Sequence, residues 1–466
     1  MNADAPRLVF DPPAEQWAPR LLEHARQGPG PEGLQFRREL GLPVDRPMVM
    51  SGHQATIWHA GILAKALASE AIADAARAAC VWLVVDQDSE RASEIRHPYL
   101  GDDGVWSTAS VRLRSQASDP ADDVAACSLP AQRPPDPHPT LPGGTPECVR
   151  SGITRVLAAF DRHSDAPDAA QQAALATSDL IADIMHPPQM IFASSIARTS
   201  LFRSLIDRMV QSPEQAALAY NRAVAQRPHV GIAPLKVDEV QDLYEMPLWA
   251  IEPGKPRRRV YAHDLGQIDH GSLAPRALLM TGILRWAACD LFVHGVGGGH
   301  YDPITEQWLG EWLGATLAPG VVASADVLLP IQARQSSPQD LARARWVAHH
   351  ARHDPGMLGE PEAAAQKAVL VQKIDARRDA GEDPLDDYRS LHKLLEMVRL
   401  RRADQLDGFN REVTRIEREL AGAAVAQDRT WPFPLHEPGA LLGLRRAIRR
   451  SFNAESLAQT PASTIP

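Results

Sequence analysis

The 466-residue sequence contains only four cysteines and no CxxC pair. Their wide spacing excludes a disulfide framework and a zinc-ribbon signature, and it favours a reducing compartment. No apolar run reaches the ~18 residues that span a membrane, and the N-terminus lacks the basic-then-apolar pattern of a signal peptide. We therefore predict a cytoplasmic protein without a membrane partner.

An excess of basic residues is also missing. The 49 lysines and arginines are outnumbered by 58 aspartates and glutamates, so the formal net charge is −9 and a general nucleic-acid binder is excluded. No P-loop of the GxxxxGK[ST] type occurs. With 44% hydrophobic and 23% charged residues the composition is that of a soluble globular protein, and the length favours two domains or one domain with a large appendage.

The clearest local pattern begins with MVMSGHQATIWHAGI at residues 48–62. Residues 48–51 predict a buried strand, residues 61–79 an Ala- and Leu-rich helix, and VWLVV at 81–85 a second buried strand. Such a βαβ unit in a parallel sheet has a right-handed crossover, so both strands end at the same edge. The residues that follow the two strands at that edge are Gly52, His53, Gln54, Asp86, Gln87 and Asp88.

Two further strands are expected to reach the same edge. QMIFASS at 189–195 predicts a third strand, with Ser194 and Arg198 in the turn before the next helix. A helix at 275–288, which carries Arg276, precedes a fourth strand in CDLFVHG. Together these elements predict an α/β fold with a Rossmann-like parallel-sheet core.

A glycine-rich run follows the fourth strand. Glycine there costs helix and strand stability, which suits backbone that a ligand approaches closely, although a flexible surface loop would have the same composition. Asp302 before Pro303 predicts a helix start, with the carboxylate as N-cap. His294, His300 and Asp302 are of the types that bind zinc or iron, but no ligand spacing specifies a metal and none is assigned. The candidate ligand-binding glycines are Gly295, Gly297, Gly298 and Gly299.

The remaining chain divides by composition. Residues 1–47 are a Pro- and charge-rich extension, and 101–147 are an irregular insertion in the core that spans 48–330. MPLWAIE and RRRVYA, separated by PGKP, predict a hairpin. Residues 331–430 predict long antiparallel helices, or a coiled-coil arm, and 431–466 a final segment with one helix. Such an arm suggests a homodimer.

Several segments of the chain resemble those of a known family. SGHQATIWHAGILAKALA followed by WLVVDQDSERASEI resembles the first βαβ unit of the bacillithiol-biosynthesis cysteine-adding enzymes. FASSIARTSLFRSLI, the hairpin, and LAPRALLMTGILRWAACDLFVHGVGGG are similar to later segments of that family, in the same order from about residue 48 to 430. The resemblance implies a nucleotidylyltransferase-like Rossmann core, a coiled-coil arm that pairs subunits, and a reaction that joins cysteine to a glucosamine-malate acceptor.

The sequence also departs from the family. His53 stands where the family favours Gln, and the acidic strand end is DQD instead of an ED-type pair. HGVGGGHYD lacks the glutamate of the family's GGPGE-type turn. The resemblance therefore implies the fold and the place of the pocket, whereas a divergent member with an altered acceptor fits the departures.

Each candidate has a plainer alternative. His53 and Gln54 could cap a turn, and Asp86 and Asp88 could cap the next helix, although two carboxylates one residue apart could together bind an amine or a metal. His59-Ala60-Gly61 weakly matches the HxGH phosphate-binding signature, with Ile62 in place of the second His. Arg198 and Arg276 are the better candidates for anion binding, and the basic hairpin 255–259 is expected to be a solvated face.

Three functions follow from these features. The first is a ligase that forms an amide between an amino acid and a small anionic amino-sugar-type acceptor, with His53, Asp86 or Asp88 as the catalytic base. A nucleotide such as ATP or ADP would suit the Rossmann-like core as a cofactor. The second is a nucleotidylyltransferase-like enzyme in which His53 and His59 stabilise charge on phosphate. The third is a nucleotide-binding scaffold without catalysis that dimerises through the arm.

Overall fold

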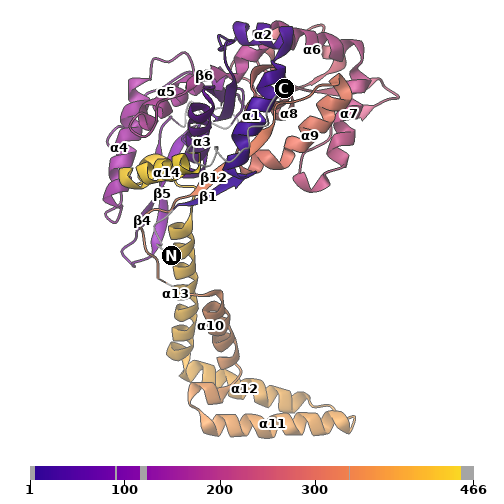
Figure 1. Ribbon diagram of the computed structural model, residues 1–466. Helices are drawn as coiled ribbons and strands as arrows, with labels where there is room; N and C mark the ends of the chain where they lie inside the picture. The colour runs from indigo at the N-terminus through magenta and orange to yellow at the C-terminus, as the bar shows by residue number, and fades with distance from the viewer. Residues whose placement is uncertain (1–5, 90–91, 116–122, 335, 453–466) are drawn as a thin grey trace.

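The computed structural model describes residues 6–89, 92–115, 123–334 and 336–452. A central sheet with helices on both faces forms the body, and the helices between residues 338 and 427 project from it as a bent arm (Figure 1). The end of the predicted C-terminal segment lies outside the described residues. Among the described residues, no helix is both long enough and apolar enough to cross a membrane.

The central sheet has six strands, of which five are parallel. The edge strand β1 runs antiparallel to β12, so part of the segment predicted to be an N-terminal extension adds a strand to the core sheet. The five parallel strands confirm the predicted parallel core. In spatial order the strands are β1 (Arg7–Asp11), β12 (Gly320–Asp326), β11 (Leu291–His294), β2 (Met48–Gln54), β3 (Ala79–Val85) and β6 (Gln189–Phe192).

The order of the five parallel strands makes the sheet doubly wound. From β2 the chain moves outward through β3 to β6, and it then returns to the other side of β2 to form β11 and β12. This is the 3-2-1-4-5 order, in which the winding direction reverses between the first and fourth strands. The reversal lies between β2 and β11, and crevices at such switch points are where α/β proteins bind ligands.

Alternate side chains of the strands enter two separate hydrophobic cores. Val49 and Trp82 point into one core, whereas Met50 and Leu83 point into the other, as strand geometry requires. The first core is covered by α1 (Trp17–Gln27), α3 (Ala60–Ala76), α4 (Glu147–Arg162), α5 (Ala169–Ile181) and α14 (Pro438–Ser451). The second is covered by α2 (Gly30–Glu39), α6 (Ser200–Gln211), α7 (Pro213–Ala225), α8 (Ala277–Ile283) and α9 (Val296–Leu313).

Two smaller sheets accompany the central one. The predicted hairpin is present as antiparallel β8 and β9, and β10 and β7 also pair with β8. The segment predicted to be irregular near 101–147 contains β5, which pairs along its length with β4. The strands are β4 (Glu94–Leu100), β5 (Trp106–Arg112), β7 (Val237–Asp238), β8 (Leu243–Ala250), β9 (Arg258–Tyr261) and β10 (Leu273–Pro275).

The arm differs from two straight antiparallel helices. The predicted helix 383–426 is interrupted at Arg402, whose φ of −111° and ψ of 25° lie outside the helical region. Its guanidinium binds Glu360 at 2.8 Å, which holds the chain at this corner. As a result, α13 lies beside α10 between the body and this corner. Helices α11 and α12 form a second pair that points in another direction (Figure 1). The helices are α10 (Pro338–Ala351), α11 (Pro361–Asp379), α12 (Leu385–Arg401) and α13 (Ala403–Gln427).

A buried carboxylate fastens the N-terminal helices to the sheet. Asp290, directly before β11, accepts hydrogen bonds from the guanidinium of Arg37 at 3.0 Å and the amide of Met48 at 2.8 Å. The His24 ring lies 3.4 Å from the same carboxylate. Burial alone would raise the pKa of Asp290, but these partners lower it below its ordinary value of 3.8.

Replacing Asp290 by Asn should destabilise the fold. The change leaves Arg37 buried without its counter-charge, so we expect the free energy of unfolding to fall by about 3–5 kcal/mol in urea titrations. Because the folded pKa is depressed, the stabilisation is complete above pH 3.8 and is lost as the pH falls through the lower folded value. The difference between wild type and variant should therefore shrink in strong acid, and a constant difference would contradict this origin.

Candidate functional site

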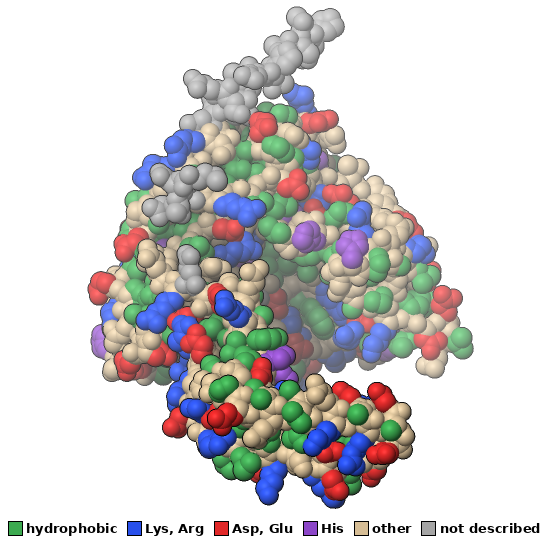
Figure 2. All heavy atoms as spheres, turned by 90° about the horizontal axis from the view of Figure 1, so that it is seen from below, with side chains coloured by type: hydrophobic (Ala, Val, Ile, Leu, Met, Phe, Trp, Pro, Cys, Tyr) green, Lys and Arg blue, Asp and Glu red, His purple; other side chains and the backbone are tan. Residues whose placement is uncertain are grey.

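A pocket of about 680 Å³ opens at the switch point of the sheet. Residues from the ends of β2, β3 and β11, the starts of α3 and α9, the β8–β9 hairpin and the root of the arm line it. The face of the body that is turned toward the arm is hollowed (Figure 2). The predicted site residues that line the pocket are Gly52, His53, Gln54, His59, Gly61, Asp88, Arg276, His294, Gly295, Gly297 and Gly298.

The end of β2 brings its backbone against β3. A Cβ added to Gly52 would lie 2.6 Å from the Leu83 carbonyl oxygen, so only glycine fits there. The next residue, His53, lines the pocket. Burial, reinforced by the charges of Lys65 and His59, lowers the pKa of His53 well below 6.5. His53 therefore presents a neutral imidazole at neutral pH.

His59 caps the N-terminus of α3. Its Nδ1 accepts a hydrogen bond from the Gly61 amide at 3.0 Å, so the neutral ring carries its proton on Nε2. A Cβ on Gly61 would lie 2.8 Å from the His59 ring, which explains the glycine at this helix start. His59 is thus a helix cap, a role that was not predicted for it, while its ring still lines the pocket.

Lys65 is a pocket residue that the sequence reasoning missed. It lies in the second turn of α3, only 6% exposed, and its Nζ donates to the Gly52 carbonyl. The ammonium also lies 5.3 Å from the centre of the Trp82 ring. Burial lowers the pKa of Lys65 from 10.5 to about 7. The available signal was the one basic residue in the otherwise apolar run AGILAKALA.

The glycine-rich run is the start of a helix and not a loop. Helix α9 begins at Val296 with Gly295 as N-cap, so the prediction that Asp302 caps the helix is wrong and Pro303 lies inside it. No side chain of the described residues caps this N-terminus, which leaves its first amides available to an anion beside the pocket. A Cβ on Gly297 would meet no atom within 4 Å, so this face is open.

The other glycines of α9 allow close packing within the protein. A Cβ on Gly298 would lie 2.8 Å from Nδ1 of His294, and one on Gly299 would lie 2.5 Å from Val322. Gly299 does not line the pocket, and neither does the exposed His300. Close approach was the expected reason for these glycines, but at these two positions the approaching group is the protein itself.

Beneath the pocket, Asp302 forms a buried charge cluster. Its two carboxylate oxygens lie 2.5 Å from Nη1 of Arg285 and 3.2 Å from Nε2 of His294. Burial would raise the pKa of Asp302, but these two neighbours lower it below its ordinary value. Asp302 therefore orients His294, which lines the pocket, without lining it itself. No group of three or more metal-ligating side chains occurs among the described residues.

The two acidic candidates after β3 face different surroundings. Asp86 is buried, accepts hydrogen bonds from the Ser194 amide and hydroxyl, and does not line the pocket. Burial raises the pKa of Asp86 to about 6, although the Ser194 hydrogen bonds oppose this shift. Joint action of Asp86 and Asp88 on one ligand is therefore wrong, because only Asp88 reaches the pocket. Ser194 fixes the end of β3, and the exposed Arg198 also lies outside the pocket.

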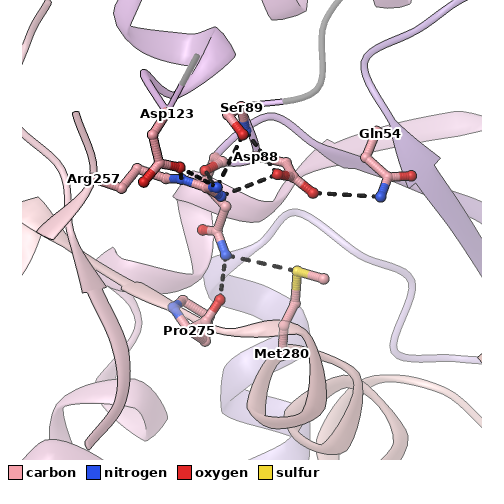
Figure 3. A network of polar contacts seen from close by, with 8 residues as sticks. Gln54, Asp88, Ser89, Asp123, Arg257, Pro275 and Met280 are labelled. Atoms are coloured by element: carbon pink, nitrogen blue, oxygen red, sulfur yellow. Dashed lines mark hydrogen bonds and ion pairs between the residues drawn. The ribbon is translucent and has the colours of Figure 1, made fainter. Parts of the chain in front are cut away.

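Arg257 of the hairpin organises the other wall of the pocket. Its guanidinium binds Asp88 at 3.0 Å and Asp123 at 2.7 Å, and Gln54 reaches Asp88 from the other side (Figure 3). The hairpin was predicted to be a solvated face, which is wrong for Arg257 because it is largely buried over the Trp249 ring. Arg276 stacks on the same ring at 4.2 Å and binds Glu245 at 2.7 Å.

Basic groups thus dominate the lining. Lys65, Arg257, Arg276 and Arg429 line the pocket with three histidines, whereas Asp88 is its only carboxylate among the described residues and is paired with Arg257. Arg429 follows α13, the last helix of the arm. It could not be predicted as a site residue, because the sequence patterns pointed to strand ends. A concave site with this lining has a positive potential that attracts anions.

Comparison with known proteins adds no identification. No family model matches the chain, and a search of curated proteins gives no match.

Replacing Lys65 by Met should stabilise the protein. Because the folded pKa of about 7 lies below 10.5, burying this amine costs free energy at low pH, and the cost declines as the pH rises from 7 toward 10.5. We expect K65M to raise the free energy of unfolding by roughly 2–4 kcal/mol at pH 6–7, allowing for the lost Gly52 hydrogen bond. Urea titrations should show the gain shrinking by about 1.4 kcal/mol per pH unit above 7. Equal stabilities at pH 6 would contradict this view of Lys65.

Proposed function

We propose that this protein is a ligase that joins an amino acid to the amine of a small, anionic, amino-sugar-type acceptor. The observation that carries the proposal is the cation-lined pocket at the switch point, with the uncapped start of α9 on one side and a neutral histidine on the other. Anionic groups of the substrates would bind the basic lining. The paired polar groups at Asp88 and Gln54 would hold the amine.

The start of α9 fits the phosphates of a nucleotide such as ATP. Its first amides have no side-chain cap among the described residues, the Gly297 face is open, and Arg276 lines the same pocket. The cavity of about 680 Å³ falls within the range of cofactor sites, ~300–1,000 Å³. A bound nucleotide would supply activation of the amino-acid carboxyl. The Gly297 amide and Arg276 would hold the phosphates of this nucleotide and exclude water from them.

The cationic lining favours the reactive form of the acceptor. An amine is a nucleophile only when neutral, and nearby positive charges lower its pKa. The amine nitrogen then forms the bond to the carboxyl carbon as the bond to the leaving oxygen breaks, and the leaving group keeps that electron pair. The amine proton passes to the imidazole of His53, which is neutral and free to accept it. Asp88 and Gln54 orient the amine during this step.

The function is testable with the purified chain. ATP, amino acids and amino-sugar acids should give an amide detected by mass spectrometry, with one pyrophosphate released per amide. His53→Ala should lower the rate at least about 100-fold, as removal of a general base does. His300→Ala is the matched control, because this histidine is exposed and outside the pocket, and its rate should not change.

A nucleotidylyltransferase-like reaction is the second candidate, favoured by the His59 Nε2 donor at the start of α3. It would also release pyrophosphate, but the nucleotide would appear in the product and no amide would form. That result would overturn the ligase. If no nucleotide is consumed with any acceptor and His53→Ala changes nothing, a binding scaffold would be the better description.

We also propose that the arm pairs two subunits. Its helices expose large apolar side chains that solvent would disfavour: Trp346, Val369, Val371, Leu385, Tyr388, Met397 and Leu400. Mixed acidic and basic side chains surround apolar ones on the arm (Figure 2).

Placing a charge on this surface should weaken the dimer. Leu400 is 73% exposed, and Leu400→Asp would bury a carboxylate in an apolar contact. We expect at least about a tenfold weaker dimer in analytical ultracentrifugation, or about 1.4 kcal/mol. Leu22→Asp on α1 of the body is the control and should leave the dimer intact. A wild-type monomer at all concentrations would refute the pairing.

A further inference from the structure

Lys65 is a buried cation without an acidic partner. Among the described residues no carboxylate lies within ion-pair distance of its Nζ, which donates to the Gly52 carbonyl and faces the Trp82 ring. In contrast, the other buried cations near the site each have a carboxylate: Arg285 has Asp302, and Arg276 has Glu245. An ammonium kept in the interior without a counter-charge is costly unless a ligand supplies one.

Lys65 and Arg429 give this side of the pocket a positive potential that acts on two neutral histidines. His53 on β2 and His59 at the start of α3 both have pKa values lowered in part by Lys65. Arg429 also lowers the pKa of His59 and lines the same pocket. The Nε2 proton of His59 is available because Nδ1 is used by Gly61.

We propose that Lys65, His59 and Arg429 form a second anion subsite, so that the acceptor carries two anionic groups, one here and one near α9. This inference rests on the proposed function for the identity of the substrate as an acceptor, but the subsite itself does not. At this site a carboxylate, sulfonate or phosphate oxygen accepts hydrogen bonds from the charged Nζ of Lys65 and from Nε2 of His59. Arg429 adds a positive charge at the outer side. Binding there places Lys65 in its protonated form, so anion binding takes up a proton.

Other charged groups near α3 do not compensate Lys65. Arg429 is paired with Asp326 at the end of β12, and Asp428 acts on His59. On the side of α14, Arg445 binds Glu70. Arg449 likewise binds Asp74 farther along α3, Cys80 of β3 lies near these two acids, and His294 of β11 is held by Asp302. The described residues supply no anion for Lys65, which leaves that place to a ligand.

The test uses anions that do not titrate. Calorimetry with the full chain compares methanesulfonate with α,ω-alkanedisulfonates of two to six carbons between pH 6.5 and 9.5. One disulfonate should bind at least tenfold more tightly than methanesulfonate, and above pH 7 its affinity should fall, by up to about tenfold per pH unit, until this gain is lost. K65M, which is expected to fold more stably, should lose both the tenfold gain and the pH dependence. Lys65→Arg should lose only the pH dependence, because Arg stays charged.

Lys255→Met is the matched control, since this exposed lysine pairs with Glu252 away from the pocket. It should bind disulfonates like wild type. If no chain length exceeds methanesulfonate, or if K65M keeps the wild-type affinity and pH profile, the subsite is refuted. If pyrophosphate release and amide formation are still observed in that case, the proposed ligase function is not refuted. Disulfonate binding as expected with no amide from any nucleotide would refute the ligase and leave the subsite.

Discussion

The reversal of winding between β2 and β11 is the constraint on which the rest of the molecule depends. Because the helices after these strands, α3 and α9, cover opposite faces of the sheet, no helix closes the edge between them. The crevice that results is walled by two helix N-termini, the β8–β9 hairpin and the root of the arm. None of the lysine and arginine side chains described in the pocket lies on the central sheet, because Lys65 belongs to α3, Arg257 to the hairpin, Arg276 to the start of α8 and Arg429 to the root of the arm.

Charge burial around this crevice follows two different patterns. Arg285 is fully buried, donates to the Ala318 carbonyl, and is neutralised by Asp302 and Glu306. This cluster is complete within the chain, so it stabilises the geometry beneath the pocket. Among the described residues, Lys65 contacts a carbonyl and an aromatic ring but no carboxylate. A buried cation that costs stability and has no acidic partner is the pattern expected of a binding site, where stability and function compete.

Sequence patterns predicted the fold better than the site. The apolar strands at 48, 81, 189 and 291 and the helix predicted at 61–79 were found because burial on both faces and helix propensity act locally. Asp302 was misplaced because its pairing with Arg285 and His294 depends on tertiary contacts. The same holds for Asp86, since two carboxylates after one strand can face different surroundings once the chain turns. Arg257 and Arg429 come from elements that only the folded chain brings to the edge.

The root of the arm connects the two parts of the protein. Arg429 follows α13, binds Asp326 at the end of β12 and lines the pocket. Two residues further on, Trp431 is buried, and Phe433 donates its amide to the Trp58 carbonyl just before α3. The segment after α13 is therefore bound to the same strand and helix ends that form the anion subsite. A change in the direction of α13 would move Arg429 relative to His59, so the charge of the pocket depends on how the arm is held.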